Sequence, residues 1–328
     1  MDKMRLKNRY LLAVVLFVAI YLSGCAFITM PLFPSTQALQ ERVLKGEGKD
    51  KILLLDISGV ISEKKRSGLP FQQETTMIED IKEALNKAER DVAIKGLILR
   101  INSPGGTITG SDILYHELTQ FKKRKGIRII ACLMDIGASG GYYVANAADE
   151  IIAHPTTITG SIGVIALKFN VKGLLDLVGI EEETIKSGKM KDLWSPFRPS
   201  TEKERKIMQV IIDKFHSRFV GVIEEGRKDL TRKEIEALAD GRIYSADQAL
   251  EAKLIDRTGY MDDAFDSMKK SLGITEATII AYERPGTYRG TIYSGSVSPA
   301  PRILNFIAAN DNGLLSPPGV QFMYLWMP

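Results

Sequence analysis

The sequence predicts an α/β fold in which a parallel sheet is covered by flanking helices and followed by a C-terminal helical extension. Two observations support this prediction. Apolar runs alternate with amphipathic stretches between about residues 51 and 155, and strands that alternate with helices form parallel sheets. From 201 to 272 the pattern changes to charged amphipathic stretches. With 328 residues, 45% of them hydrophobic, the chain can bury a large core.

The predicted elements follow one another in a regular order. Continuous apolar runs predict buried strands at 51–61, 94–101, 127–134 and 150–155. Apolar residues at helical spacing predict helices at 76–90 and 111–124, and a short helix follows Ser139. A long helix begins at Ser200 and Thr201, with Glu204 in its first turn. Shorter helices are predicted at 231–240, 245–254 and 261–272.

The composition excludes several classes of protein. Lys and Arg number 44 against 40 Asp and Glu, so the net charge of +4 indicates no surface suited to nucleic acid. Two cysteines cannot form a disulfide framework, and Cys132 lies in an apolar run typical of a buried core residue. The three histidines share no metal-ligand spacing, so the sequence predicts no metal site.

The first 25 residues resemble a bacterial export signal. Basic residues precede the uncharged run Tyr10–Leu22, and Cys25 ends the lipobox-like stretch LSGC. In a lipoprotein Cys25 would be lipidated and become the new N-terminus, whereas an uncleaved run would stay as a transmembrane anchor. Both alternatives place the remaining chain at a membrane surface outside the cytoplasm, in the bacterial cell envelope.

The segments on either side of the predicted folded domain, 51–275, differ from it in composition. Residues 26–50 predict a tether from the membrane. The tail, 276–328, becomes rich in Pro, Gly, Ser and Thr beyond about residue 283 and then ends in an apolar stretch. We expect a loose extension whose apolar end docks on a partner subunit or a membrane.

Three glycine-containing turns follow three successive predicted strands. They are Asn102–Gly106, the residues around Ser139, and Thr159–Gly163. The carboxyl ends of parallel strands meet at one edge of a sheet, where ligands bind. Because glycine lets a substrate lie close to the main chain, these turns predict a site built from backbone amides.

Ser139 has two interpretations. It lies between Gly137 and the pair Gly140 and Gly141, at the start of a predicted short helix. It is therefore either an N-cap that stabilises the helix by about 1 kcal/mol or a nucleophile placed where a substrate can approach closely. As a nucleophile it would also have helix amides nearby to stabilise an oxyanion.

The base for such a nucleophile is a histidine or a lysine. His154 stands at a predicted strand end, whereas His116 and His216 lie in amphipathic helices and are expected at the surface. A lysine acts as a base only when neutral, so burial must lower its pKa. Lys189 and Lys191 would share a face of an extended chain, so their spacing does not choose between them.

Four blocks lie in order between about residues 50 and 270: LRINSPGG, GASGGYYVANAADEIIAHPTTITGSIGVI, IKSGKMKDLWSPFRPST and DGRIYSADQALEAKLID. Together they strongly resemble bacterial signal peptide peptidase A in its short, single-repeat form. The resemblance implies a Clp protease/crotonase-like fold and a membrane-bound serine-lysine protease that digests signal peptides after secretion. It implies no metal or cofactor.

The resemblance also assigns roles to individual residues. The nucleophile is Ser139, and the general base is Lys191, held by a hydrogen bond from Ser161. His154 then has a structural role. The oxyanion would be bound by backbone amides of the glycine turns: Gly105, Gly106 or Gly140.

The family implies a homo-oligomeric ring whose apolar cleft binds hydrophobic peptides. The lipobox-like stretch departs from the plain anchor of the family, which leaves the mode of anchoring open.

Two other functions fit parts of the pattern. A crotonase relative would use paired glycine amides to hold a thioester enolate, but the export signal opposes a cytoplasmic acyl-CoA substrate. An inactive scaffold would bind hydrophobic peptides without cutting them. A missing lysine would favour the scaffold, whereas both Lys189 and Lys191 are present.

Overall fold

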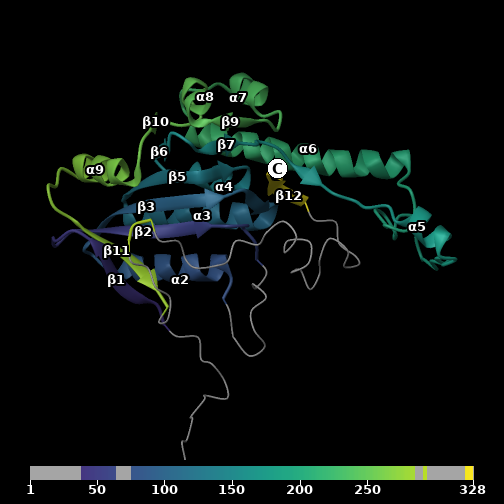
Figure 1. The fold of residues 1–328 in the computed structure, drawn as a ribbon, viewed down its shortest axis with the longest axis horizontal. Helices are drawn as coiled ribbons and strands as arrows, with labels where there is room; N and C mark the ends of the chain where they lie inside the picture. Colours follow the sequence, from purple (N-terminus) through teal and green to yellow (C-terminus); the bar gives the residue numbers. More distant parts are fainter. Residues whose placement is uncertain (1–37, 64–74, 285–290, 294–321, 328) are drawn as a thin grey trace, which may run out of the picture. The chain divides into compact units, whose positions relative to one another are not determined.

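The computed structural model describes residues 38–63, 75–284, 291–293 and 322–327, which all belong to one compact unit (Figure 1). The apolar run at Tyr10–Leu22 and the lipidation site expected at Cys25 lie outside these residues. Among the helices of the described ranges, none is both long and apolar enough to cross a membrane. The same ranges contain no cluster of side chains suited to a metal ion.

Most of the described strands form one large sheet, with the order β1-β11-β2-β3-β5-β6-β10, and β7 pairs with both β5 and β9. The pairs β2–β3, β3–β5, β5–β6 and β5–β7 are parallel, as the sequence predicts. Its strands are β1 (Gln40–Lys45), β2 (Lys51–Ser58), β3 (Ile94–Ser103), β5 (Arg128–Ala138), β6 (Glu150–Ala153), β7 (Ile158–Gly160), β9 (Ile243–Ser245), β10 (Arg257–Thr258) and β11 (Thr278–Glu283).

A second, three-stranded sheet has the order β4-β12-β8. Its strands are β4 (Gly105–Thr107), β8 (Ile165–Ala166) and β12 (Phe322–Leu325). β4 directly follows β3, and β8 follows the turn after β7. The second sheet therefore lies at the edge where the strands of the first sheet end, beside the three glycine turns.

The helices cover both faces of the large sheet. They are α2 (Met77–Arg90), α3 (Ile108–Lys125), α4 (Gly140–Ala145), α5 (Lys172–Leu177), α6 (Glu202–Gly226), α7 (Arg232–Leu238), α8 (Ala246–Glu251) and α9 (Met261–Leu272). Leu97 and Leu99 of β3 belong to the core with α2, α3 and α6, whereas Ile98 between them packs with Met268 of α9. This alternation follows the two-residue period of a strand buried on both faces.

The helix starts and the buried cysteine agree with the sequence. Thr76 and Thr201 form capping boxes at α2 and α6, and Thr201 does so with the predicted Glu204. Cys132 is fully buried, which raises the pKa of its thiol to about 12. The prediction that it is a core residue is confirmed.

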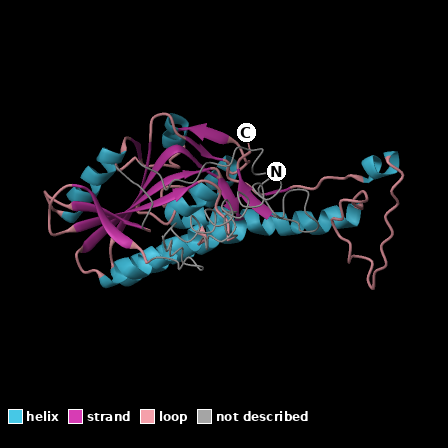
Figure 2. Ribbon diagram, turned by 60° about the horizontal axis from the view of Figure 1, so that its bottom comes forward, coloured by secondary structure: helices cyan, strands magenta, loops and turns pink. Residues whose placement is uncertain are grey.

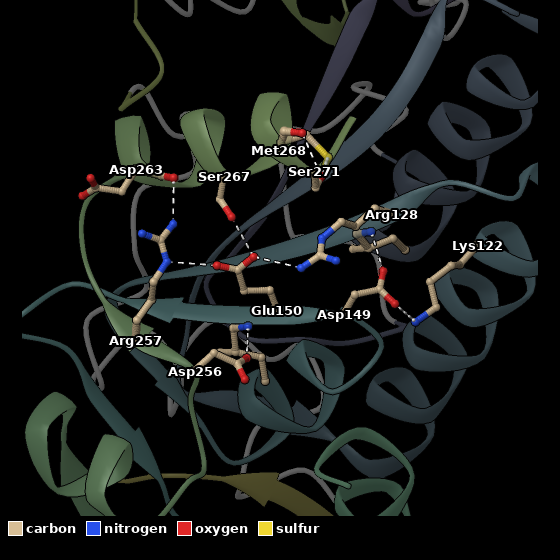
Figure 3. A network of polar contacts seen from close by, with 12 residues as sticks. Lys122, Arg128, Asp149, Glu150, Asp256, Arg257, Asp263, Ser267, Met268 and Ser271 are labelled. Carbon is tan, nitrogen blue, oxygen red and sulfur yellow. Dashed lines mark hydrogen bonds and ion pairs between the residues drawn. The ribbon is translucent and has the colours of Figure 1, made fainter. Parts of the chain in front are cut away.

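A polar network joins α9 to the amino end of β6 (Figure 3). The Glu150 carboxylate accepts hydrogen bonds from Arg257 Nε at 2.9 Å, Arg128 Nη2 at 3.1 Å and Ser267 Oγ at 2.8 Å. The glycine turns follow the opposite, carboxyl ends of the strands. We therefore interpret this network as structural.

The two ends of the folded domain differ from the predicted organisation. β1 lies in the segment expected to be a tether and pairs antiparallel with β11, which itself lies in the predicted tail. The apolar end of the tail does not extend outward. Residues Phe322–Leu325 form β12, which pairs with this chain's own β4 and β8.

Candidate active site

The structure brings the three glycine turns together. The end of β5, Ile136–Ala138, pairs in parallel with β7, so the Ser139 turn lies beside the third turn. The Ser139 amide donates a hydrogen bond to the Gly160 carbonyl at 2.7 Å. The first turn is also adjacent, because a Cβ atom on Gly105 would lie 2.6 Å from the Gly140 nitrogen.

Ser139 has a strained backbone and does not cap the helix that follows it. Its φ of 52° and ψ of −117° lie in a region that residues with a side chain rarely adopt. Its side chain makes no capping hydrogen bond to α4. The N-cap interpretation is therefore wrong. Such a conformation costs about 1–3 kcal/mol, and strained residues of this kind cluster at active sites.

The glycines around Ser139 are explained by close packing. A Cβ atom on Gly140 would lie 2.4 Å from Ser111 Oγ, and one on Gly141 would lie 2.7 Å from the Ser103 carbonyl oxygen. A Cβ atom on Gly137 would lie 2.8 Å from the Leu133 side chain. The serine, which is only 1% exposed, is held in a turn that no bulkier neighbours could form.

The backbone groups of the first turn already have several partners. The Gly105 amide donates to Ser103 Oγ at 3.1 Å, and its carbonyl accepts from the Ile61 amide at 2.9 Å. Gly106 pairs with Ile61 on one side and with Tyr324 of β12 on the other. The Gly105 amide is thus already engaged, and Gly106 lies in the ladder with β12 in this structure.

Ser161 lies in the third turn, next to a cavity of about 250 Å³. It is mostly buried, has a φ of 49°, and donates its amide to the Arg242 carbonyl at 2.7 Å. The cavity lies between the third turn and the end of β12. Its lining residues are Ser161, Gly163, Val164, Ile165, Gly241, Leu325, Trp326 and Met327.

Lys191 does not lie beside the three glycine turns. It is exposed, as is Lys189, on the segment that connects α5 to α6. This segment extends away from the large sheet (Figure 2). Among the described residues of one chain, the structure places no lysine of this segment beside Ser139. The burial expected of a lysine base is therefore absent from the single chain.

An ionic network anchors the segment that carries Lys191. Arg198 donates to Asp192 Oδ2 at 2.7 Å and to Glu204 Oε2 at 3.0 Å. Hydrogen bonds from Arg198 lower the pKa of the buried Glu204 carboxyl to about 2. Arg198, and then Lys186, also hold the pKa of Asp192 well below its usual range. The sequence suggested no role for Arg198, because irregular segments have no periodicity to place it.

The alternative base, His154, has a structural environment. It follows β6 and packs edge-on against the Tyr260 ring, with the ring centroids 4.9 Å apart. Burial lowers the pKa of its imidazole. His116 is exposed, as expected, whereas His216 is half-buried and its Nε2 lies 2.8 Å from the Ala239 carbonyl oxygen.

Comparison with known proteins identifies the family. Residues 121–275 match Peptidase family S49. Over 255 residues the chain is 38% identical to "Putative signal peptide peptidase SppA" of Enterococcus faecium, covering 78% of this chain and 73% of the relative. The chain belongs to this peptidase family.

The family membership confirms the resemblance and the Clp protease/crotonase-like fold inferred from the sequence. "Serine protease SPPA, chloroplastic" of Arabidopsis thaliana is 31% identical over 76% of this chain and 37% of its own length. Among solved structures, a membrane-bound stomatin-specific protease aligns with a TM-score of 0.43 and 14% identity, over 67% of this chain and 85% of that one.

Proposed function

We propose that this S49 peptidase is a membrane-associated serine endopeptidase that uses a dyad of Ser139 and Lys191. Its substrates are cleaved signal peptides and other hydrophobic peptides outside the cytoplasm. The observation that most supports the proposal is the backbone of Ser139. Ser139 is strained and buried, it lies in one of three adjoining glycine turns, and its hydroxyl is not used to cap a helix.

The proposed chemistry needs only residues of this protein. The neutral amine of Lys191 takes the proton of the Ser139 hydroxyl while Oγ attacks a peptide carbonyl. The amides of Gly106 and Gly140 stabilise the oxyanion. The ammonium of Lys191 then protonates the leaving amine, and water hydrolyses the acyl-enzyme by the same steps in reverse order. Ser161 holds the lysine through its hydroxyl.

The exposed position of Lys191 supports a site shared between copies of the chain. A lysine must be desolvated to act as a neutral base near neutral pH, whereas Lys191 is exposed in the single chain. In the homo-oligomeric ring that we propose, Lys191 of one copy would enter the Ser139 site of its neighbour. The network of Asp192, Arg198 and Glu204 would hold the segment in place for this contact.

Activity measurements on single substitutions test the dyad. The full chain in detergent is assayed on a fluorogenic peptide with an apolar stretch, and Ser139→Ala, Lys191→Ala and Lys189→Ala are compared with the unsubstituted chain. Both dyad variants should lose nearly all activity, while Lys189→Ala serves as the matched control and should keep it. Cleavage by Ser139→Ala at the original rate would disprove the proposal.

A further inference from the structure

The short helix that follows Ser139 is held by the hydroxyls of two tyrosines. α4 has only six residues and begins with two glycines, so its own hydrogen bonds do little to fix its direction. Tyr142 and Tyr143 are both fully buried. The Tyr142 hydroxyl donates to the Leu254 carbonyl at 2.6 Å, and the Tyr143 hydroxyl donates to Asp112 Oδ1 of α3 at 2.5 Å. Tertiary contacts therefore set where the Ser139 turn lies.

The Tyr143 contact differs from the other because its acceptor is a carboxylate that also binds a cation. Arg218 of α6 donates to the same Asp112 oxygen, through Nε at 3.1 Å and Nη2 at 2.9 Å. Hydrogen bonds to a charged acceptor are about twice as strong as those between neutral groups. Burial, followed by the Asp112 carboxylate, raises the pKa of Tyr143 well above its usual range. The phenol therefore stays protonated and remains the donor.

Tyr143 is joined to Ser139 through the main chain and packs against both neighbouring helices. Its amide donates to the Ser139 carbonyl at 2.8 Å. Its ring lies edge-on to Tyr115 of α3 and Phe219 of α6, with the ring centroids 5.5 and 5.0 Å away. The φ of 52° at Ser139 persists only where the surrounding contacts over-determine it. Tyr143 supplies such contacts one helical turn after the strained serine.

We propose that Asp112 and Arg218 are positioning residues for the reaction at Ser139, on which they act through the Tyr143 hydroxyl. Neither residue belongs to the proposed dyad or to the glycine turns. By fixing Tyr143 they fix the start of α4, and with it the backbone that aims the Ser139 hydroxyl at a substrate carbonyl. Misplacing a reacting group by about 1 Å can lower a rate by about 10²-fold. The proposal rests on the proposed function, because it concerns the reactivity of Ser139.

Steady-state kinetics of Tyr143→Phe test the role of the hydroxyl. The substitution keeps the buried ring and removes only the hydrogen bond to Asp112. With the full chain in detergent and the fluorogenic peptide, kcat should fall at least about tenfold. KM should stay nearly the same, because the lost interaction acts on the reacting group and not on peptide binding. An unchanged kcat would overturn the proposal.

Tyr115→Phe is the matched control for a merely structural effect. Tyr115 is also buried, and its hydroxyl also donates to a carboxylate, Glu225 Oε2 of α6, at 2.7 Å. This hydrogen bond joins α3 to α6 and does not involve α4. Both substitutions should lower the urea midpoint of unfolding, but only Tyr143→Phe should lower kcat. Equal losses of kcat in the two variants would show that helix packing alone is responsible, and the positioning role would be refuted.

A double-substitution cycle tests whether Arg218 acts through Tyr143. Arg218→Met should lower kcat in the unsubstituted chain but have little further effect when the Tyr143 hydroxyl is already absent. Asp112→Asn keeps an acceptor oxygen for the phenol and should retain more of kcat than Asp112→Ala. Independent losses from Arg218→Met and Tyr143→Phe would refute the role of Arg218. Equal kcat values of the two Asp112 variants would refute the role of Asp112.

Stability measurements separate this proposal from the dyad, because they need no activity. If the network enforces the Ser139 backbone, Ser139→Gly should gain less in unfolding midpoint over Ser139→Ala when the chain also carries Tyr143→Phe, since the turn can then relax. An equal gain with and without Tyr143→Phe would refute the network. A reduced gain in chains that cleave nothing would keep the network and refute the dyad. Cleavage that requires Ser139 but is insensitive to Tyr143→Phe would keep the dyad and refute the network.

Discussion

The amide of Ser139 donates to the carbonyl of Gly160 at 2.7 Å, and this hydrogen bond joins two turns that both have unusual backbones. Ser139 has a φ of 52°, Gly160 of 82° and Ser161 of 49°. Two of these three residues are serines, although glycine would adopt the conformation more easily. Serine is therefore less favourable than glycine at positions 139 and 161, and its presence at both is expected of a functional site and not of an ordinary turn.

Replacing Ser139 by glycine should abolish activity and give a more stable protein than replacing it by alanine. Glycine adopts the observed φ and ψ without strain, so Ser139→Gly should raise the free energy of unfolding by about 1–2 kcal/mol relative to Ser139→Ala. Denaturant unfolding of the two inactive variants measures the difference. Equal stability of the two would show that the serine backbone is not strained.

Mixing two inactive variants should restore activity if the site is shared between copies. Ser139→Ala retains Lys191, and Lys191→Ala retains Ser139, so a mixed oligomer contains some sites with both intact residues. Co-expressed or exchanged subunits should recover a fraction of the original kcat, whereas each variant alone has none. The control mixes Lys191→Ala with a chain that carries both Ser139→Ala and Lys191→Ala, so that neither chain supplies Lys191. If a verified mixed oligomer recovers no activity, the Ser139 and Lys191 of one active site come from the same copy of the chain.

Gly105→Ala should damage the site more than an equivalent change elsewhere. Gly105 has a φ of 102°, and a Cβ atom there would lie 2.0 Å from the Tyr324 carbonyl oxygen and 2.6 Å from the Gly140 nitrogen. We expect a loss of about 1–3 kcal/mol in stability from strain and a large fall in kcat/KM. Gly126→Ala is the matched control, because its φ is 66° but no atom lies within 4 Å of the added Cβ. It should leave kcat/KM unchanged.

The sequence predicted the elements that local patterns determine. The apolar runs placed β2, β3, β5 and β6, because strands of a covered parallel sheet are apolar throughout. The glycine turns were recognised because glycines follow three successive apolar runs, and the structure explains two of these glycines, since Gly140 and Gly141 have no room for side chains. The strained backbone of Ser139 could not be predicted, since a serine between glycines is equally typical of an N-cap.

Contacts between distant or irregular segments were not predicted. β12 follows a long stretch rich in Pro, Gly and Ser, and its pairing with β4 depends on an edge more than 200 residues earlier. An apolar tail indicates that something must cover it, but not which surface does so. The exposed position of Lys191 is the usual one for a lysine, but the sequence did not choose it over the burial that a base needs, because the resemblance assigned a role without a location.

Cys25→Ala separates the two expected forms of membrane attachment. A lipoprotein loses its lipid when this residue is replaced, because the thioether is formed at the cysteine. We expect Cys25→Ala to lose metabolic lipid labelling and to shift on a gel as the uncleaved precursor accumulates. Ser23→Ala, which keeps the cysteine, is the control. Unchanged mobility and an absence of labelling in the original chain would instead indicate an uncleaved anchor.

Arg198 should determine how the segment that carries Lys191 responds to acid. The folded pKa values of Asp192 and Glu204 are lowered by Arg198. Carboxyls with lowered pKa values stabilise the folded state above their unfolded pKa, which for Glu204 is about 4.5, and this stabilisation is lost as pH falls through the folded pKa. For Glu204 that folded value is about 2. The network should therefore persist at neutral pH and release the segment in the acid range between these values.

Trp194 reports this release locally. It lies in the same segment, with Lys168 5.7 Å from its ring centroid, and its fluorescence can be followed alone in a Trp326→Phe chain. Arg198→Met leaves the buried Glu204 without its cation, so the acid midpoint should move to higher pH and kcat/KM should fall at neutral pH. Arg205→Met removes the same charge from the start of α6, where Arg205 bonds to the Ser200 carbonyl, and should change neither value. An unchanged midpoint in Arg198→Met would mean that the network does not hold the segment, and the proposed placement of Lys191 would lose its support.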